Sequence, residues 1–164
     1  MKNKAEGEML AHEAKMMAKF KEEREANPNR GKSKQVIVMR TDLGMRKGKM
    51  IVQGAHASMK AVLEQMTTMM QDGIVVGTGF DYGDLDNTAL GDWLIDKFTK
   101  ICVKGESEEH IKDLYAKAKA LRIPCSLILD AGLTEFKEPT YTCIAIGPAW
   151  SDEVDKITDG LSLL

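Results

Sequence analysis

The chain has 164 residues, of which 43% are hydrophobic and 29% charged, with a net charge of −2 at pH 7. These values are ordinary for a folded protein, and the length suits one domain with a sizeable core. No run of about 18 apolar residues exists, so no membrane-spanning helix is predicted, and the charged start lacks the apolar stretch of a secretory signal. Three widely spaced cysteines argue against a disulfide framework or a zinc site, and we expect reduced thiols in the cytoplasm.

The charged residues are distributed unevenly along the chain. Residues 1–34 hold nine basic and six acidic side chains, whereas the remainder of the chain is acidic. Within that remainder, the stretch from Arg40 to Lys60 contains five basic residues and only one acidic residue, Asp42. A focused basic patch suits a small phosphate-bearing target better than a long duplex.

Residues 1–33 form a predicted helical extension and linker. Helix-forming Ala, Glu, Lys and Met dominate residues 1–26, and Pro28 and Gly31 mark the linker that follows. A narrow apolar stripe on this helix would contain either Met9, Met16 and Phe20, or Leu10, Ala14 and Met17. The pattern leaves three arrangements open: a helical arm packed on the domain, packed on a partner copy, or loose.

Residues 34–164 predict a single α/β domain. Apolar and β-branched segments predict strands at 35–39, 99–104, 125–129 and 140–146, the last closed by Gly147-Pro148. Helical spacing predicts helices over about 47–70, 93–97, 107–121 and 151–160, and the glycine-rich segment 72–92 is a probable loop insertion. We expect a core-facing stripe on the first of these helices, made of Ile51, Ala55, Met59, Val62, Met66 and Met69. The order of elements predicts a four-stranded mixed sheet with helices on both faces.

Two segments that follow predicted strands carry the candidate chemistry. One runs from Arg40 into Lys49, and the other from Asp130 to Thr134. If the two strands are parallel neighbours, both segments face one crevice, which would also receive His56 from the helix. Each piece has a simpler reading: Asp130-Ala131-Gly132 is typical of a turn, and the helical stripe of Lys49, Gln53, His56 and Lys60 is typical of a solvent-facing surface.

The joint pattern is far more specific than its parts. It consists of Arg40-Thr41-Asp42-Leu43-Gly44-Met45, Lys47-Gly48-Lys49, Gln53, His56-Ala57, Asp130-Ala131-Gly132, Thr134 and Ile146-Gly147-Pro148. In these motifs and their order, residues 34–164 resemble the archaeal and eukaryotic-type (type 2) peptidyl-tRNA hydrolases. The resemblance implies cleavage of the ester that joins a peptide to the terminal ribose of tRNA, a four-stranded mixed sheet between helices, usually a homodimer, and neither a metal nor a cofactor.

The same resemblance assigns the family's functional lysine, aspartate and threonine to Lys49, Asp130 and Thr134, with Gln53 and His56 near the site. The sequence departs from the family pattern in its N-terminal extension, in the segment 72–92, and at Asp96-Lys97-Phe98-Thr99, where the family usually has a Gly-Gln-Pro turn. These departures leave the proposed catalytic residues unchanged, but the latter two affect how tRNA would approach.

A mechanism follows as a hypothesis. Asp130 orients or deprotonates a water, Lys49 stabilises negative charge or holds a terminal phosphate, Thr134 binds the oxyanion or positions the water, and His56 is the reserve base. Substrate contacts are expected from Arg40, Asp42, Arg46, Lys47, Gln53 and Lys60. The alternative is a non-catalytic module of the same fold that binds tRNA or a protein. A nuclease is disfavoured, because the sequence offers no carboxylate cluster for metal ions.

Overall fold

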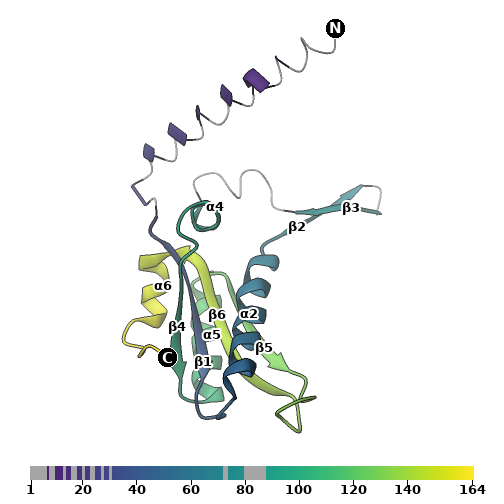
Figure 1. The fold of residues 1–164 in the computed structure, drawn as a ribbon, viewed down its shortest axis with the longest axis vertical. Helices are drawn as coiled ribbons and strands as arrows, with labels where there is room; N and C mark the ends of the chain where they lie inside the picture. Colours follow the sequence, from purple (N-terminus) through teal and green to yellow (C-terminus); the bar gives the residue numbers. More distant parts are fainter. Residues whose placement is uncertain are drawn as a thin grey trace.

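The structure is a computed structural model that describes residues 31–71, 74–79 and 88–164, together with 7, 10–12, 14–15, 18–19, 21–22, 25–26 and 28–29. The described positions between 7 and 26 are helical, as expected of the extension. The elements that follow are β1 (Ser33–Arg40), α2 (Lys47–Leu63), β2 (Thr67–Gln71), β3 (Ile74–Gly79), α4 (Ala89–Ile95), β4 (Lys100–Gly105), α5 (Glu108–Ala120), β5 (Cys125–Asp130), β6 (Thr140–Trp150) and α6 (Ser151–Thr158) (Figure 1).

The predicted four-stranded mixed sheet is confirmed, with the strand order β4-β1-β6-β5. β1 runs parallel to β4, whereas β6 is antiparallel to both of its neighbours, β1 and β5. The condition set for the strands before Arg40 and Asp130, that they be parallel neighbours, is met only in part, because β6 lies between them. β1 and β5 are still parallel to each other, so their carboxyl ends reach the same edge of the sheet.

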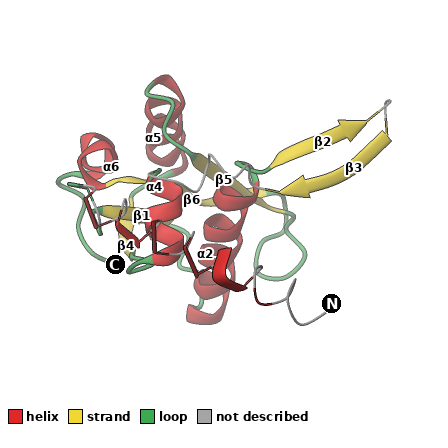
Figure 2. Cartoon of the chain, turned by 90° about the horizontal axis from the view of Figure 1, so that it is seen from above, coloured by secondary structure: helices red, strands yellow, loops and turns green. Residues whose placement is uncertain are grey.

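Helices cover both faces of the sheet (Figures 1 and 2). Alternate residues of β1 point to opposite faces, so Val36 and Val38 enter one core while Ile37 and Met39 enter the other. The first core lies beneath α5 and α6 and includes Ile111, Leu114, Ala118, Val154 and Ile157. The second lies beneath α2 and includes Met45, Ala57, Ala61, Ile128, Cys143 and Ala145.

The predicted core-facing stripe of α2 is wrong. The buried residues of this helix are Gln53, Ala57 and Ala61, whereas the side chains of Ile51 and Met59 are 72% and 60% exposed. Small side chains let a helix approach a sheet closely, and here the alanines occupy that face of α2. The large apolar residues consequently lie on the outer side of the helix.

The helix also ends earlier than predicted, at Leu63 instead of Met70. Residues 67–71 form β2, which pairs with β3 in a separate antiparallel ladder that projects from the body beyond α2 (Figure 2). The segment 72–92, predicted to be a loop insertion, thus contains β3 and the start of α4, while 72–73 and 80–87 lie outside the described residues. The short helix predicted at 93–97 begins earlier, at Ala89, where the Thr88 hydroxyl accepts a hydrogen bond from Gly91 N–H.

Asp92 of α4 fastens the start of β1 to the body. Its buried carboxylate accepts hydrogen bonds from Gly31 N–H (2.8 Å) and from the N–H and hydroxyl of Ser33 (3.3 and 2.5 Å). On the other side of this segment, Ser151 N–H donates to the carbonyl of Lys32 (2.7 Å). The backbone of residues 31–33 is therefore held at a fixed place beside α4.

The last strand and the chain end complete the sheet. β6 does not stop at Ile146 as predicted but continues through Gly147-Pro148 to Trp150, where it pairs with Ser33 at the start of β1. At the opposite edge, Leu163 forms a bridge with Val103 of β4, and Leu164 N–H donates to Cys102 O (3.1 Å). In the part of the chain that the structure describes, no helix is both long and apolar enough to cross a membrane.

Candidate active site

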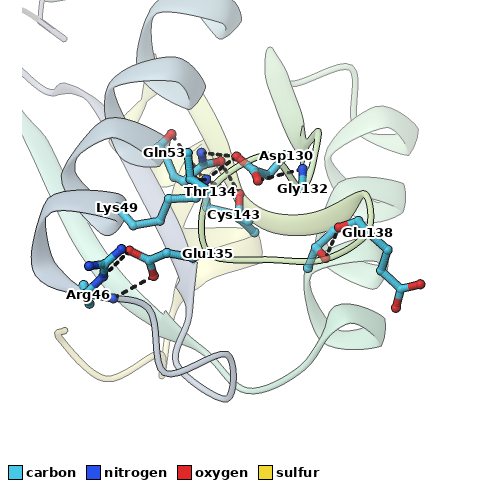
Figure 3. Close-up of polar contacts among 11 residues, drawn as sticks. Arg46, Lys49, Gln53, Asp130, Gly132, Thr134, Glu135, Glu138 and Cys143 are labelled. Carbon is cyan, nitrogen blue, oxygen red and sulfur yellow. Dashed lines mark hydrogen bonds and ion pairs between the residues drawn. The ribbon is translucent and has the colours of Figure 1, made fainter.

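Lys49, Asp130 and Thr134 meet at one point although they come from three different elements (Figure 3). Lys49 lies in the first turn of α2, Asp130 is the last residue of β5, and Thr134 belongs to the loop between β5 and β6. Lys49 Nζ donates to Asp130 Oδ2 over 2.5 Å and to Thr134 Oγ1 over 3.0 Å. The predicted meeting of an ammonium group, a carboxylate and a hydroxyl is thus present in the geometry.

The Asp130 carboxylate is held as an anion by three donors. Besides Lys49, its Oδ2 accepts from Gln53 Nε2 (2.9 Å), and its Oδ1 accepts from Gly132 N–H (3.1 Å). The hydrogen bond from Lys49 is the main cause that lowers the pKa of Asp130 below its ordinary value, while partial burial acts in the opposite direction. Because the side chains of Lys49 and Asp130 are only 10% and 13% exposed, solvent screens this pair weakly.

Gln53 links the Asp130 carboxylate to buried residues of β6 through hydrogen bonds. Its Oε1 accepts a 2.6 Å hydrogen bond from the hydroxyl of buried Thr142 on β6, which fixes Nε2 as the group that faces Asp130. The thiol of Cys143 donates to the Gln53 carbonyl (3.3 Å), and burial raises the pKa of this thiol to about 12. All three cysteines are free, and Cys125 and Cys143 are buried.

The loop that carries Thr134 is tied to the start of α2. Glu135 accepts from Arg46 N–H (3.1 Å) and from Arg46 Nε (2.8 Å), which also places a carboxylate at the positive end of the helix. Gly132 has φ +79°, and a Cβ there would lie 2.6 Å from the backbone of Glu138, so this turn requires glycine. These contacts hold the Thr134 hydroxyl beside Lys49.

Arg40 and Asp42, predicted to contact substrate, form an ion-pair cluster beyond the end of β1. Arg40 is 8% exposed, and it donates to Asp42 (2.6 and 3.1 Å), to Glu108 (3.2 Å) and to the Tyr141 carbonyl (2.8 Å). The hydrogen bond from Arg40 is the main cause that lowers the pKa of Asp42. A phosphate contact from Arg40 would require these pairs to open, so the geometry gives it a structural role.

The remaining predicted residues are exposed on or beside α2. Arg46 and Lys47 lie at its start, and Lys60 lies near its end, 3.6 Å from Glu64. His56 is also exposed, and none of the hydrogen bonds or ion pairs recorded among the described residues involves it. The structure therefore brings Lys49, Gln53, Asp130 and Thr134 together but does not bring His56 into contact with them.

Sequence reasoning missed three residues that shape this site: Glu135, Phe136 and Thr142. The centroid of the Phe136 ring lies 5.4 Å from Lys49 Nζ, and the Thr142 hydroxyl orients the Gln53 amide by donating to its Oε1. Glu135 and Phe136 directly follow Thr134 in the sequence, so their position near the site could have been predicted from that neighbour. Thr142 carries no such signal, because a threonine in a β-branched strand is indistinguishable from any other strand residue.

The fold and the site together define an α/β protein in which an ammonium group, a carboxylate and a hydroxyl converge at the edge of a mixed sheet, a set of groups that can position a water and stabilise an oxyanion. Comparison with known proteins gives the family. The chain belongs to the peptidyl-tRNA hydrolase PTH2 family, whose model matches residues 33–164.

Curated archaeal relatives agree with this assignment. A peptidyl-tRNA hydrolase of Methanocaldococcus jannaschii is 39% identical over 131 residues, which cover 80% of this chain and 99% of that protein. One of Sulfurisphaera tokodaii is 40% identical over 132 residues (80% and 98%), and one of Halobacterium salinarum is 38% identical over 130 residues (79% and 98%).

Proposed function

We propose that this chain hydrolyses the ester bond between peptide and tRNA in peptidyl-tRNA and releases free tRNA. The observation that carries the proposal is the contact of Lys49 with both Asp130 and Thr134, within a chain that aligns with the named relatives over almost their whole length. Such a site supplies a fixed cation for the developing oxyanion and fixed acceptors for an attacking water.

Asp130 acts in this proposal by orienting the water. The pKa of its carboxyl is lowered, mainly by the hydrogen bond from Lys49, so the group is a weak base near neutral pH. Its Oδ1 accepts only from Gly132 N–H among the described residues, which leaves lone-pair capacity for a water. The water is thereby aligned toward the acyl carbon by a group that stays ionised.

Thr134 and Lys49 act on the other side of the acyl carbon. Thr134 Oγ1 accepts from Lys49, so its own hydroxyl hydrogen remains able to donate to the oxyanion or to the water. Lys49 is already oriented by two partners before substrate arrives, and this limits the reorganisation needed during the reaction. His56 stays the reserve base, to be reached through water from its exposed position on α2.

We propose that the exposed cationic side chains at the start of α2 bind phosphates of the tRNA. Arg46 and Lys47 lie in or next to the first turn that carries Lys49, so phosphates of the tRNA acceptor end would lie near the reacting ester. Lys60 extends this row along the helix. Arg40 and Asp42 would contribute by fixing the segment between β1 and α2.

The test is incubation with a labelled N-acetyl-aminoacyl-tRNA, followed by separate measurement of ester loss and RNA length. The proposal expects loss of the ester with intact RNA, and turnover reduced by two or more orders of magnitude in Asp130→Asn, since one amide cannot accept from all three donors. Tight binding without turnover would favour the non-catalytic module, and shortened RNA would favour a nuclease.

A salt titration tests these proposed phosphate contacts separately from catalysis. The variant Arg46→Ala/Lys47→Ala should lower the slope of log affinity against log salt by about 1 to 2, because each lost phosphate contact removes roughly 0.7 to 0.9 of slope. Lys156→Ala, on α6 at the other face of the sheet, is the control and should leave the slope unchanged. We also propose a cytoplasmic location and a homodimer, to be checked by fractionation and by sizing.

A further inference from the structure

Arg46 connects the proposed phosphate contacts to the loop between β5 and β6 (Figure 3). It is the N-cap residue of α2, and its backbone N–H and side-chain Nε donate to the two carboxylate oxygens of Glu135 over 3.1 and 2.8 Å. Glu135 directly follows Thr134, whose hydroxyl accepts from Lys49 over 3.0 Å. A guanidinium on the surface is therefore connected to a group of the candidate site through a single carboxylate.

The two partners of this ion pair differ in their exposure to solvent. The side chain of Arg46 is 80% exposed, whereas that of Glu135 is 16% exposed. An ion pair with so exposed a partner contributes little stability by itself, because water screens the charges and a long side chain must be ordered. In the absence of RNA, the side-chain half of the contact is consequently weak, and the backbone N–H of Arg46 is left to hold Glu135.

The guanidinium of Arg46 also has unused donors. An arginine side chain carries five N–H groups in a planar fork, and Glu135 binds the one on Nε. None of the hydrogen bonds or ion pairs recorded among the described residues involves Nη1 or Nη2 of Arg46. These two nitrogens form an edge that can bind a phosphate through two parallel hydrogen bonds. One guanidinium can therefore hold Glu135 and a phosphate at the same time.

The local charge favours an anion as the second partner. Arg46, Lys47 and Lys49 are cationic. Glu135 and Asp130 are the carboxylates that pair with two of these cations, so one positive charge is left in excess. The first turn of α2 contains no acidic residue, and the positive end of the helix dipole adds to this charge. Partial burial acts to raise the pKa of Glu135, but the hydrogen bonds from Arg46 outweigh it and lower the pKa, so this carboxyl is an anion near neutral pH.

We propose that Arg46 determines specificity for the RNA part of the substrate: a tRNA phosphate bound at Nη1 and Nη2 fixes the guanidinium, which then holds Glu135 and thereby the Thr134 hydroxyl in place. The inference rests on the proposed hydrolysis of peptidyl-tRNA, and it adds that the RNA accelerates the reaction as well as binding. Binding energy from a part of the substrate that does not react is thus used in the transition state. Arg46 and Glu135 act as positioning residues, since they act through Thr134.

The test compares two esters in single turnovers extrapolated to saturating enzyme. One is N-acetyl-aminoacyl-tRNA, and the other carries the same acyl group on adenosine alone, which has no phosphate. Each rate is divided by the rate of spontaneous hydrolysis of that ester. The tRNA ester is expected to react about three- to tenfold faster, and by no more than the loss that Thr134→Val causes, since the effect acts through this hydroxyl. Equal normalised rates would overturn the inference alone, whereas hydrolysis of neither ester would refute the proposed function itself.

Two substitutions and their combination assign the rate advantage to this path. In Glu135→Gln the amide oxygen still accepts from Arg46 N–H but the ionic contact with Nε is lost, so the ratio of the two rates should fall to about 1. Its affinity for tRNA should not fall, because a carboxylate beside the phosphate is removed. Arg46→Lys keeps the charge and most of the tRNA affinity, but an ammonium group lacks the planar fork, so its ratio should also be about 1.

The double variant should lose no more than either single variant, because both substitutions interrupt one path. Additive losses, or a ratio like that of the parent in either single variant, would overturn the proposal. A lower tRNA affinity of Glu135→Gln would do the same, since it would indicate a general disturbance of the site.

Glu138→Gln is the matched control. It removes the same charge from the same loop, but the Glu138 side chain points away from the site (Figure 3). None of the hydrogen bonds or ion pairs recorded among the described residues involves its carboxylate. Its rate ratio should equal that of the parent protein. A fall as large as that in Glu135→Gln would show that the loop responds to any lost charge and would overturn the role of Glu135.

Discussion

Replacing Lys49 with methionine removes the positive charge of this side chain but keeps most of its packing. Methionine keeps an unbranched side chain beside Phe136, while Asp130 loses its 2.5 Å contact and keeps the donors of Gln53 and Gly132. Removing one partner of a fully buried pair costs about 3–5 kcal/mol. Because two donors remain here and both side chains are slightly exposed, we expect the free energy of unfolding to fall by about 1–3 kcal/mol.

The effect on catalysis should be larger than the effect on stability. A preorganised donor to an oxyanion contributes roughly 100- to 1,000-fold in rate, so single-turnover hydrolysis of N-acetyl-aminoacyl-tRNA should fall by at least about 100-fold in Lys49→Met. Lys156→Met is the control, since it removes the same charge from α6, at the other face of the sheet, away from Asp130 and from the proposed tRNA contacts. Hydrolysis by Lys49→Met within about threefold of the parent rate would refute the role of the ammonium group.

The pH dependence provides an independent readout. The folded-state pKa of Asp130 is lowered from its ordinary value of 3.8, so its contribution to stability is complete above that value and is lost as the pH falls through the folded pKa. In Lys49→Met the main lowering cause is gone, the pKa of Asp130 should rise, and less stability should be lost on acidification. NMR titration of the carboxyl carbon measures this shift directly.

Three further substitutions probe the surroundings of the site. Thr134→Val should reduce hydrolysis by about tenfold or more while Thr134→Ser restores most of it, as measured by single-turnover kinetics, because the hydroxyl is the shared group. Arg40→Met should lower the free energy of unfolding by about 1–3 kcal/mol in denaturant titrations, because it leaves Asp42 without its cation and the Tyr141 carbonyl without this donor, while Glu108 keeps Lys112; an unchanged midpoint would contradict the structural role. Gly132→Ala should reduce both the melting temperature and hydrolysis, since its Cβ would lie 2.6 Å from the Glu138 backbone.

The strands were predicted from local signals, whereas the meeting of Lys49, Asp130 and Thr134 followed from local signals only under a condition and was otherwise implied by the family resemblance. β-branched runs mark the strands, and polar residues after two parallel strands reach one edge of the sheet. The insertion of β6 between β1 and β5 could not be predicted in this way, since strand order depends on contacts between distant segments. The insertion of β6 did not disturb the site, because the carboxyl ends of β1 and β5 still lie at the same edge of the sheet.

The face of α2 was mispredicted for a physical reason. Large apolar side chains were assigned to the core by size, but the helix packs on the sheet through Ala57 and Ala61 and leaves Ile51 and Met59 outside. The spacing of apolar residues shows that a helix carries a stripe on one side. When a helix carries two stripes, the spacing does not show which of them faces the core. The end of α2 was missed because methionine is a good helix former, and the β-branched Thr67 and Thr68 that begin β2 were given too little weight.

The three groups that meet at the candidate site differ in the backbone that carries them. Lys49 stands on a helix and Asp130 ends a strand, whereas Thr134 sits in an irregular connection anchored at both ends by β5 and β6. The charged pair is thus placed by regular elements, whereas the hydroxyl is placed by a loop that the contacts between Glu135 and Arg46 tie to the start of α2. The position of the hydroxyl relative to the ion pair therefore depends on two side chains outside the site, Arg46 and Glu135, so a change at either of them would displace Thr134 while leaving the contact between Lys49 and Asp130 in place.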